Sequence, residues 1–137
     1  MADQITVDGV VSVPQDEVTL LLECGYLYME MQKLREAEEI FTGVAALVPH
    51  SEVPLICLGN LFFSQGRFDR ALKYHRDALK KQPASALAQA HIGEALIFSK
   101  KRDQGKSELE AAVAMDPDGD AATFANSLLD AMAAGVI

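Results

Sequence analysis

The sequence predicts an all-α protein in which three helix–turn–helix repeats stack into an α-solenoid and a final helix caps the array. Three sets of residues recur at intervals of 34 positions in the 137-residue chain. The first set comprises Gly25, Gly59 and Gly93, and the second comprises Pro49, Pro83 and Pro117. The third set comprises the small residues Ala37, Ala71 and Gly105. A shared period of this length is typical of repeat proteins, in which neighbouring helix pairs bury each other's apolar faces.

Residues 1–16 precede the first repeat and carry no helical pattern. Two β-branched stretches flank the dipeptide Asp8-Gly9, which favours a hairpin turn, although two short strands alone are marginally stable in water. Two interpretations stay open: a mobile tail, or an extended arm that docks its valines onto the helical body or a second subunit. Because Pro14 cannot continue a helix backward, we expect the first helix to begin after it, with Asp16 as its N-cap.

The central repeat, residues 52–85, shows how each unit is built. Its first helix carries apolar residues along one face, namely Leu55, Leu58, Leu61 and Phe62. After a turn at Gln65-Gly66-Arg67 a second set follows, namely Phe68, Ala71, Leu72, Ala78 and Leu79. We expect Gly59 and Ala71 to let the two helices approach closely, and Pro83 to end the second helix. Neither helix can bury its apolar face alone, so the repeats must stack.

The same register assigns helices along the whole chain. First helices are expected at 17–31, 52–65 and 86–99, and second helices at 34–48, 68–81 and 102–115. The repeats span 18–51, 52–85 and 86–119 within residues 17–119. Residues 120–137 hold a further helix at 121–132, in which Phe124, Leu128 and Met132 share one side. A helix in this position covers the exposed core of the last repeat.

This pattern resembles the tetratricopeptide repeat, in which apolar and aromatic residues, glycine, alanine and proline stand at fixed offsets. The central repeat matches at Leu55, Leu58, Gly59, Phe62, Ala71 and Pro83, and departs at His75, where an aromatic residue is usual. The first repeat matches at Leu21, Gly25, Tyr28, Ala37, Phe41 and Pro49, with Cys24 in place of leucine. The third repeat keeps Gly93 and Pro117 and replaces several other residues. The resemblance covers residues 18–119.

Charge is unevenly distributed along the chain, whose net charge is −8. Residues 1–32 and 107–137 each hold six acidic residues and no Lys or Arg, so all twelve bases fall within 33–106. We expect no nucleic-acid binding, because recognition of the phosphate backbone depends on clustered Lys and Arg, and we interpret the bases of 67–81 as a solvated helix face. A homodimer stays an open alternative, because the acidic ends of one chain could attract the basic middle of another.

The sequence also carries information about localisation. No stretch approaches the roughly 18 consecutive apolar residues that a membrane-spanning helix needs, so we expect no membrane span. The N-terminal residues lack the pattern of a secretory signal, and we therefore expect a cytoplasmic protein. Cys24 and Cys57 lie within first helices, without a CxxC spacing, and are interpreted as reduced packing residues.

We find no set of residues that points to catalysis. The three histidines, His50, His75 and His91, are expected to lie far apart, with His75 packed in or beside the interior. No glycine-rich phosphate-binding loop is present in the sequence. We therefore expect a protein that is not an enzyme and that binds no metal and no cofactor.

The tetratricopeptide resemblance implies a concave groove lined by the first helices. Aligning the three helices places nine residues in it: Leu22, Tyr26, Met29, Ile56, Asn60, Phe63, Ala90, Glu94 and Ile97. Ile56 and Phe63 lie off the core stripe of their helix, so we interpret them as an apolar surplus available for binding a peptide. Relatives that grip a carboxylate tail use Lys, Arg and Asn in such places, and here only Asn60 fits. A carboxylate clamp is therefore not expected.

Within this family the chain resembles the small acidic class II chaperones of bacterial type III secretion, which hold translocator subunits before export. The shared traits are three repeats with a final helix, small size, low isoelectric point and an apolar groove, and residues 126–132 are similar to their last helix. Residues 1–16 depart from the helical segment with which those chaperones begin. The resemblance implies a bacterial cytoplasmic chaperone that holds an extended apolar segment of a secreted client. The alternative is a general scaffold that joins subunits of another assembly.

Overall fold

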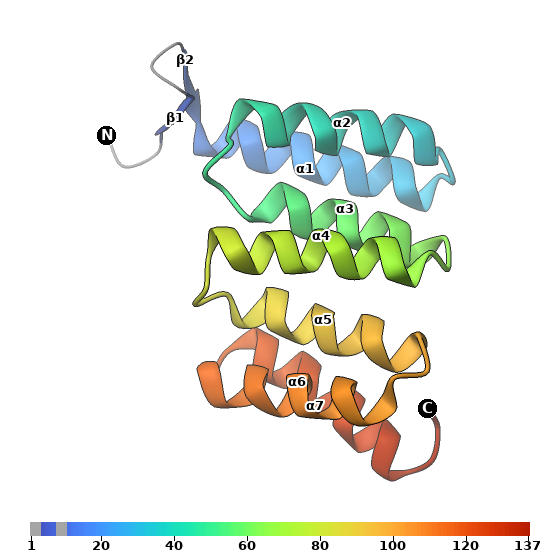
Figure 1. Ribbon diagram of the computed structural model, residues 1–137. Coiled ribbons are helices and arrows are strands. Elements are labelled where there is room, and N and C mark those ends of the chain that lie inside the picture. The colour runs from blue at the N-terminus through green and yellow to red at the C-terminus, as the bar shows by residue number, and fades with distance from the viewer. Residues whose placement is uncertain (1–3, 8–10) are drawn as a thin grey trace.

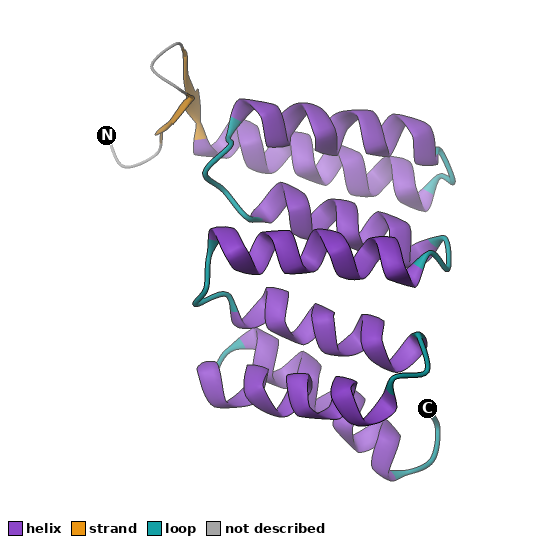
Figure 2. Ribbon diagram, viewed as in Figure 1, coloured by secondary structure: helices purple, strands orange, loops and turns teal. Residues whose placement is uncertain are grey.

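The computed structural model describes residues 4–7 and 11–137, in which a two-stranded hairpin precedes seven α-helices (Figure 1). The strands are β1 (Gln4–Val7) and β2 (Val11–Pro14). The helices are α1 (Gln15–Glu30), α2 (Leu34–Leu47), α3 (Val53–Ser64), α4 (Phe68–Lys81), α5 (Ala86–Phe98), α6 (Arg102–Met115) and α7 (Asp120–Ala133). Figure 2 shows that helices make up almost all of the described chain. The protein is therefore an all-α stack of three tetratricopeptide-type helix pairs with a capping helix, as the sequence predicts.

The end of β2 packs against the helical body. Strands β1 and β2 pair antiparallel, with Ile5 opposite Val13. The side chain of Val13 is 8% exposed and belongs to the core cluster that contains Val18 and Leu22 of α1. This favours the docked-arm interpretation for Val13. The predicted turn at Asp8-Gly9 lies outside the described residues.

Helix α1 begins earlier than predicted, and the expected N-cap is wrong. Pro14 occupies the N-cap position with φ −59° and ψ 138°, and the helix starts at the next residue. Because proline fixes φ near the helical value and has no N–H to satisfy, the chain can enter the helix directly from β2. Asp16 lies in the first turn, near the positive end of the helix dipole. The other helix bounds lie within one residue of the expected positions.

The repeated glycines allow each helix pair to pack closely. A Cβ atom on Gly25, Gly59 or Gly93 would overlap the side chain of Phe41, His75 or Leu109, respectively. The expected partner of Gly59 was Ala71, but the imidazole of His75 fills the space above this glycine. In the third repeat the carbonyl oxygen of Gly105 also lies 3.0 Å from the added Cβ position. The glycine therefore accommodates a ring or a leucine from the second helix.

The buried core continues from one repeat to the next. Its first part spans α1 to α4 and includes Val18, Phe41, Phe62 and Ala71, one from each helix. Its last part joins α5, α6 and α7 through Ala90, Ile97, Leu109, Ala112, Ala125 and Met132. Helix α7 thus covers the apolar face that the third repeat would otherwise expose. Among the described residues no helix is both long and apolar enough to span a membrane.

Candidate functional site

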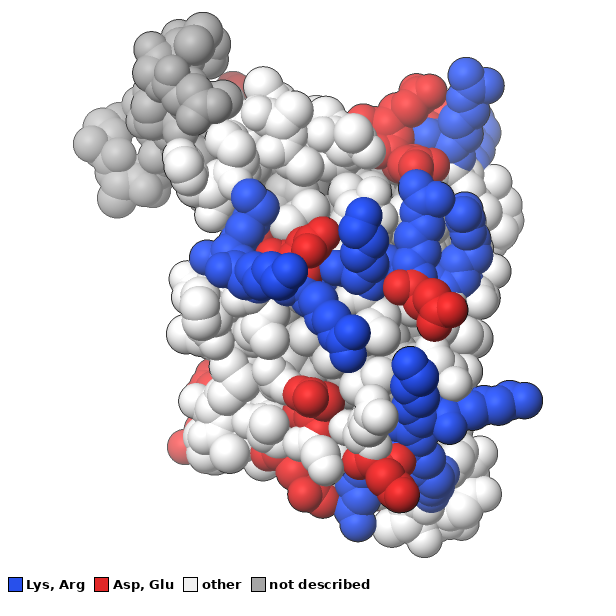
Figure 3. All heavy atoms as spheres, in the orientation of Figure 1, with Lys and Arg blue, Asp and Glu red and all other residues white. Residues whose placement is uncertain are grey.

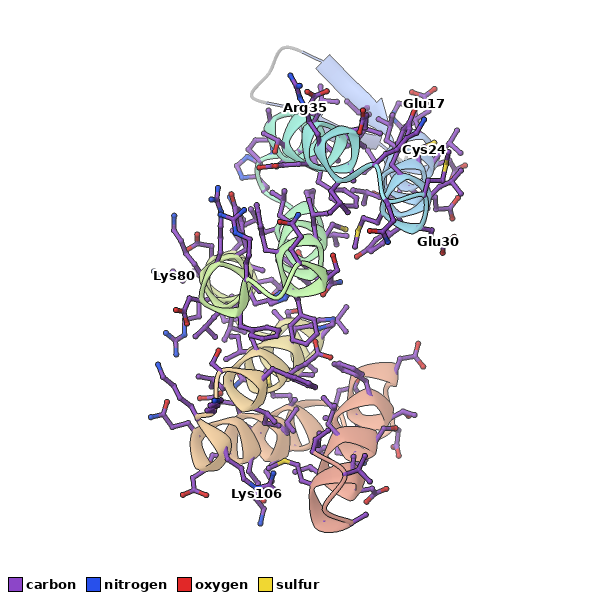
Figure 4. The ribbon with its side chains drawn as sticks, turned by 90° about the vertical axis from the view of Figure 1, so that its right-hand side faces the viewer. Glu17, Cys24, Glu30, Arg35, Lys80 and Lys106 are labelled. Carbon is purple, nitrogen blue, oxygen red and sulfur yellow. The ribbon has the colours of Figure 1, made fainter. Side chains whose placement is uncertain are left out.

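The two helices of each repeat lie on opposite sides of the array. In Figure 4 α1, α3 and α5 follow one side, with α7 on the same side as α1, while α2, α4 and α6 follow the other. The side formed by the first helices contains a pocket of about 370 Å³ between α1, α3 and the start of α5, which we call the groove pocket. Small-molecule and peptide anchor sites commonly begin at about this volume.

The groove pocket has apolar walls and a polar rim. Its walls are formed by Val18, Leu22, Tyr26, Val53, Ile56, Cys57 and Leu87. Its polar lining comprises Gln15, Thr19, Glu23, Ser51, Glu52, Asn60 and Ser85. Val53 and Leu87 are 41% and 43% exposed, so apolar surface at this rim faces solvent. Another hollow of about 420 Å³ lies at the turn between α3 and α4, but Arg67, Asp69 and Arg70 line it, so it offers little apolar surface.

One hydrogen bond crosses the groove pocket from α1 to α3. The side-chain amide of Asn60 donates to the phenolic oxygen of Tyr26 at 2.9 Å. Burial raises the pKa of the Tyr26 phenol well above its usual value, and burial also raises the pKa of the neighbouring Cys57 thiol. Both groups are therefore uncharged at neutral pH, and this wall is polar at one point without carrying charge.

The structure separates the predicted groove residues into two groups. Leu22, Tyr26, Ile56 and Asn60 line the groove pocket together. The other five predicted residues, Met29, Phe63, Ala90, Glu94 and Ile97, do not line it. Met29 is half-buried against the core of the first two repeats. Predicted groove residues of α1 and α3 therefore line this pocket, whereas the predicted residues of α5 do not.

Three of the predicted residues lie in the core or partly within it. Ile56 is only 4% exposed and packs with Ala78 and Ala88, so it is not surplus to the core as expected, although its outer edge reaches the pocket. Ala90 and Ile97 are buried under α7, which corrects their expected exposure. The reason is that α3 and α5 each pack against neighbours on more than one face, so residues off the predicted stripe are covered too.

Phe63 and Glu94 take part in other contacts. The ring of Phe63 lies 5.0 Å from that of Phe68 and 5.3 Å from that of Phe98, which forms an aromatic cluster at the turn end of α3, α4 and α5. The carboxylate of Glu94 lies 3.1 Å from Nδ1 of His91. Phe63 is therefore half-buried by neighbouring aromatic rings and does not stand free in a groove.

The alignment missed several residues of the pocket, although the register contained a signal for them. Thr19, Val53 and Leu87 are separated by 34 residues each and all line the pocket. They lie one helical turn before the positions that were chosen, near the N-terminal ends of α1, α3 and α5. The same 34-residue register, applied one turn closer to the start of each first helix, predicts these three residues.

Two of the histidines lie together, whereas the sequence predicted that all three would be far apart. The rings of His75 and His91 stack with centroids 4.8 Å apart, and His91 also contacts the ring of Phe124 at 4.9 Å. His75 is fully buried, and neither of its ring nitrogens has a hydrogen-bond partner among the described residues. Burial, with His91 adding to it, lowers the pKa of His75 to about 3. Two of the three histidines therefore meet, but they form no metal-binding group among the residues that the structure describes.

Helix α1 carries only acidic charged residues, whereas the bases of the opposite side are concentrated on α4. In Figure 4 Glu17 and Glu30 project from the side of α1, whereas Lys80 projects from the opposite side of the array. Figure 3 shows Lys and Arg side chains crossing the middle of the face formed by the second helices, over α4. Among the residues that line the groove pocket the charged ones are Glu23 and Glu52. The charge at the groove pocket is therefore negative.

Comparison with known proteins supports the same fold. The sequence model of the tetratricopeptide repeat family matches residues 62–128. Anaphase-promoting complex subunit 3 of Schizosaccharomyces pombe is 27% identical over 94 residues, a match that covers 69% of this chain and 14% of that protein. This chain thus spans a small part of the length of that curated relative.

Two solved structures are similar over most of their length. The type III secretion translocator chaperone SycD of Yersinia enterocolitica has a TM-score of 0.75 at 18% identity, over 85% of this chain and 90% of that one. The first repeat domain of Spaghetti (RPAP3), bound to the HSP90 peptide SRMEEVD, has a TM-score of 0.70 at 22% identity, over 91% and 98%. The 34-residue register, the stacked helix pairs and the family match over residues 62–128 together show that the chain is built from tetratricopeptide-type repeats.

Proposed function

We propose that this protein is a binding module that holds an extended apolar segment of a partner protein in the groove pocket, and that it has no catalytic role. The observation that carries the proposal is the apolar rim of that pocket, where Val53 and Leu87 are more than two-fifths exposed. Exposed apolar side chains beside a concave apolar wall are typical of peptide-binding surfaces.

The size of the pocket favours a segment with several anchors. Burying one leucine or valine side chain contributes about 1.5–3 kcal/mol, and micromolar affinity requires about 8 kcal/mol after the entropic cost of binding. A single side chain in a pocket of about 370 Å³ is therefore insufficient. An extended segment can place alternate side chains toward α1, α3 and α5, which is the arrangement that we propose.

We further infer that this protein is a bacterial cytoplasmic chaperone and that the bound partner is its client. The similar fold of SycD supports this, and one SycD structure, similar to this chain with a TM-score of 0.72 at 17% identity, holds a peptide of the translocator YopD. The acidic peptide SRMEEVD bound to Spaghetti is a poorer guide, because Glu23 and Glu52 at this rim would repel its carboxylates. A scaffold that joins subunits is the second candidate, and the likeness to a subunit of the anaphase-promoting complex favours it.

The first experiment tests the pocket itself. An eight-residue fluorescent peptide in which leucines alternate with serines is titrated with the protein, and binding is measured by fluorescence anisotropy. The variant Leu87→Asp should abolish binding and keep the fold, because this side chain is 43% exposed at the rim and is not part of the buried core. The control Leu20→Asp, which changes a leucine that is 59% exposed and does not line the pocket, should bind as the wild type does. Equal binding by Leu87→Asp would show that the peptide binds elsewhere.

The second experiment separates a chaperone from a scaffold. Each candidate partner is expressed alone and together with this protein, and its soluble fraction is measured. A client of a chaperone is insoluble alone and soluble in the pair, and Leu87→Asp should remove this effect. A partner that is equally soluble alone indicates a scaffold.

A further inference from the structure

We propose that the segment bound in the groove pocket carries Lys or Arg beside its apolar residues, and that the rim carboxylates of Glu23 and Glu52 select it. The inference rests on the proposed function and specifies the chemistry of the partner. Glu23 comes from α1, and Glu52 directly precedes α3, so the two carboxylates belong to different walls of one pocket.

Both carboxylates are free to bind a cation. Neither Glu23 nor Glu52 forms an ion pair or a side-chain hydrogen bond with any described residue. The cation that contacts the loop before α3 is Lys81, and its ammonium donates to the carbonyl oxygen of Pro49. Both acids are therefore available to a partner.

The surroundings of the rim strengthen its negative potential. Lys, Arg and His are absent from the residues that line the pocket, and Tyr26 and Cys57 stay neutral because burial raises the pKa of each. Helix α1, which supplies Glu23, carries no base. The bases of α4 project from the other side of the array (Figures 3 and 4). A field of one sign over a pocket favours partners of the opposite sign and disfavours acidic ones.

The expected preference is moderate and depends on salt. An ion pair at an exposed rim changes affinity by roughly two- to fivefold, so two such contacts change it by about tenfold. Screening by salt should reduce the difference strongly, because the Debye length falls to about 4 Å at about 0.5 M ionic strength. The apolar contribution does not share this dependence.

The test uses three peptides that differ only in charge. Each places alternating leucines between two flanking residues, which are Lys in the first peptide, Gln in the second and Glu in the third. Binding is measured by anisotropy at about 20 mM and about 500 mM NaCl. We expect the Lys peptide to bind about tenfold more tightly than the Glu peptide at low salt, with the Gln peptide between them.

Two double variants locate the effect. Glu23→Gln with Glu52→Gln should bring the three affinities together, whereas Glu17→Gln with Glu30→Gln makes the same change in net charge away from the pocket and should preserve the order. Equal affinities for the three peptides in the wild type, or equal loss of preference in both double variants, would overturn this inference and leave the proposed function standing. Binding of none of the three peptides would overturn both.

Discussion

Tyr26 and Asn60 stand one repeat apart in the sequence, and the amide of Asn60 donates a hydrogen bond to the phenolic oxygen of Tyr26 at 2.9 Å. Equivalent positions of neighbouring first helices therefore meet directly across the groove. The contact fixes the spacing between α1 and α3 at the wall of the groove pocket, so it connects the repeat register with the shape of the binding surface.

The first prediction concerns this hydrogen bond. A double-mutant cycle with Tyr26→Phe and Asn60→Ala should give a coupling of about 1 kcal/mol in the free energy of unfolding, as expected for a partly buried neutral pair. Urea denaturation measures it. A second cycle that pairs Tyr26→Phe with Ser127→Ala on α7 should give a coupling near zero, because these residues are distant. A coupling near zero for the first pair would show that the bond contributes nothing to stability.

The second prediction concerns the close approach at Gly59. Gly59→Ala places a methyl group against the imidazole of His75, and this overpacking should destabilise the fold by on the order of 1–3 kcal/mol. The matched control is Gly43→Ala on α2, where nothing lies within 4 Å of the added Cβ. This control should stabilise the protein by up to about 1 kcal/mol, because alanine favours helix over glycine. Thermal melts of both variants should shift in opposite directions, and an unchanged melting temperature for Gly59→Ala would contradict the packing.

The third prediction concerns the burial of Ile56. Ile56→Asp places a carboxylate among Ala78 and Ala88, so it should cost several kcal/mol or unfold the central repeat. Val53→Asp, three residues earlier on an exposed part of the same helix, should leave the melting temperature nearly unchanged. Circular dichroism melts distinguish the two variants. Similar melts would mean that Ile56 faces solvent after all.

The fourth prediction concerns pH and His75. The pKa of this residue is about 3 in the folded protein and near 6.5 in an unfolded chain. Between these values the unfolded state binds the extra proton, so stability is complete above about pH 6.5 and falls as the pH drops toward 3. His91 stacks on the ring of His75, and Glu94 contacts His91.

The corresponding measurement compares His75→Phe with the wild type. Gly25 already accommodates Phe41 at the equivalent place, so phenylalanine should fit over Gly59. Between about pH 7 and about pH 5 the wild type should lose on the order of 2 kcal/mol more than the variant in urea denaturation. His50→Gln, at an exposed site, should lose as much as the wild type does. Equal losses in the wild type and His75→Phe would show that His75 does not determine the acid sensitivity.

The sequence predicted the helices because their signals are local. Glycine and proline recur at fixed places, and the apolar residues between them follow a helical face, so the helix bounds agree within two residues. The tetratricopeptide fold and the capping α7 follow from the same register. The start of α1 was misplaced, because the sequence does not tell whether Pro14 or Asp16 holds the N-cap position.

Only the tertiary structure decided which apolar residues face a ligand. Helices α3 and α5 are apolar on most sides, so the pattern does not distinguish a face covered by the next repeat or by α7 from a face that lines a groove. Ile56, Ala90 and Ile97 are therefore buried, and the groove pocket lies nearer the starts of the first helices. The contact of His75 with His91 depends in the same way on how one repeat stacks on the next. The period of the sequence determines the repeat, whereas the packing between repeats determines the surface that remains free.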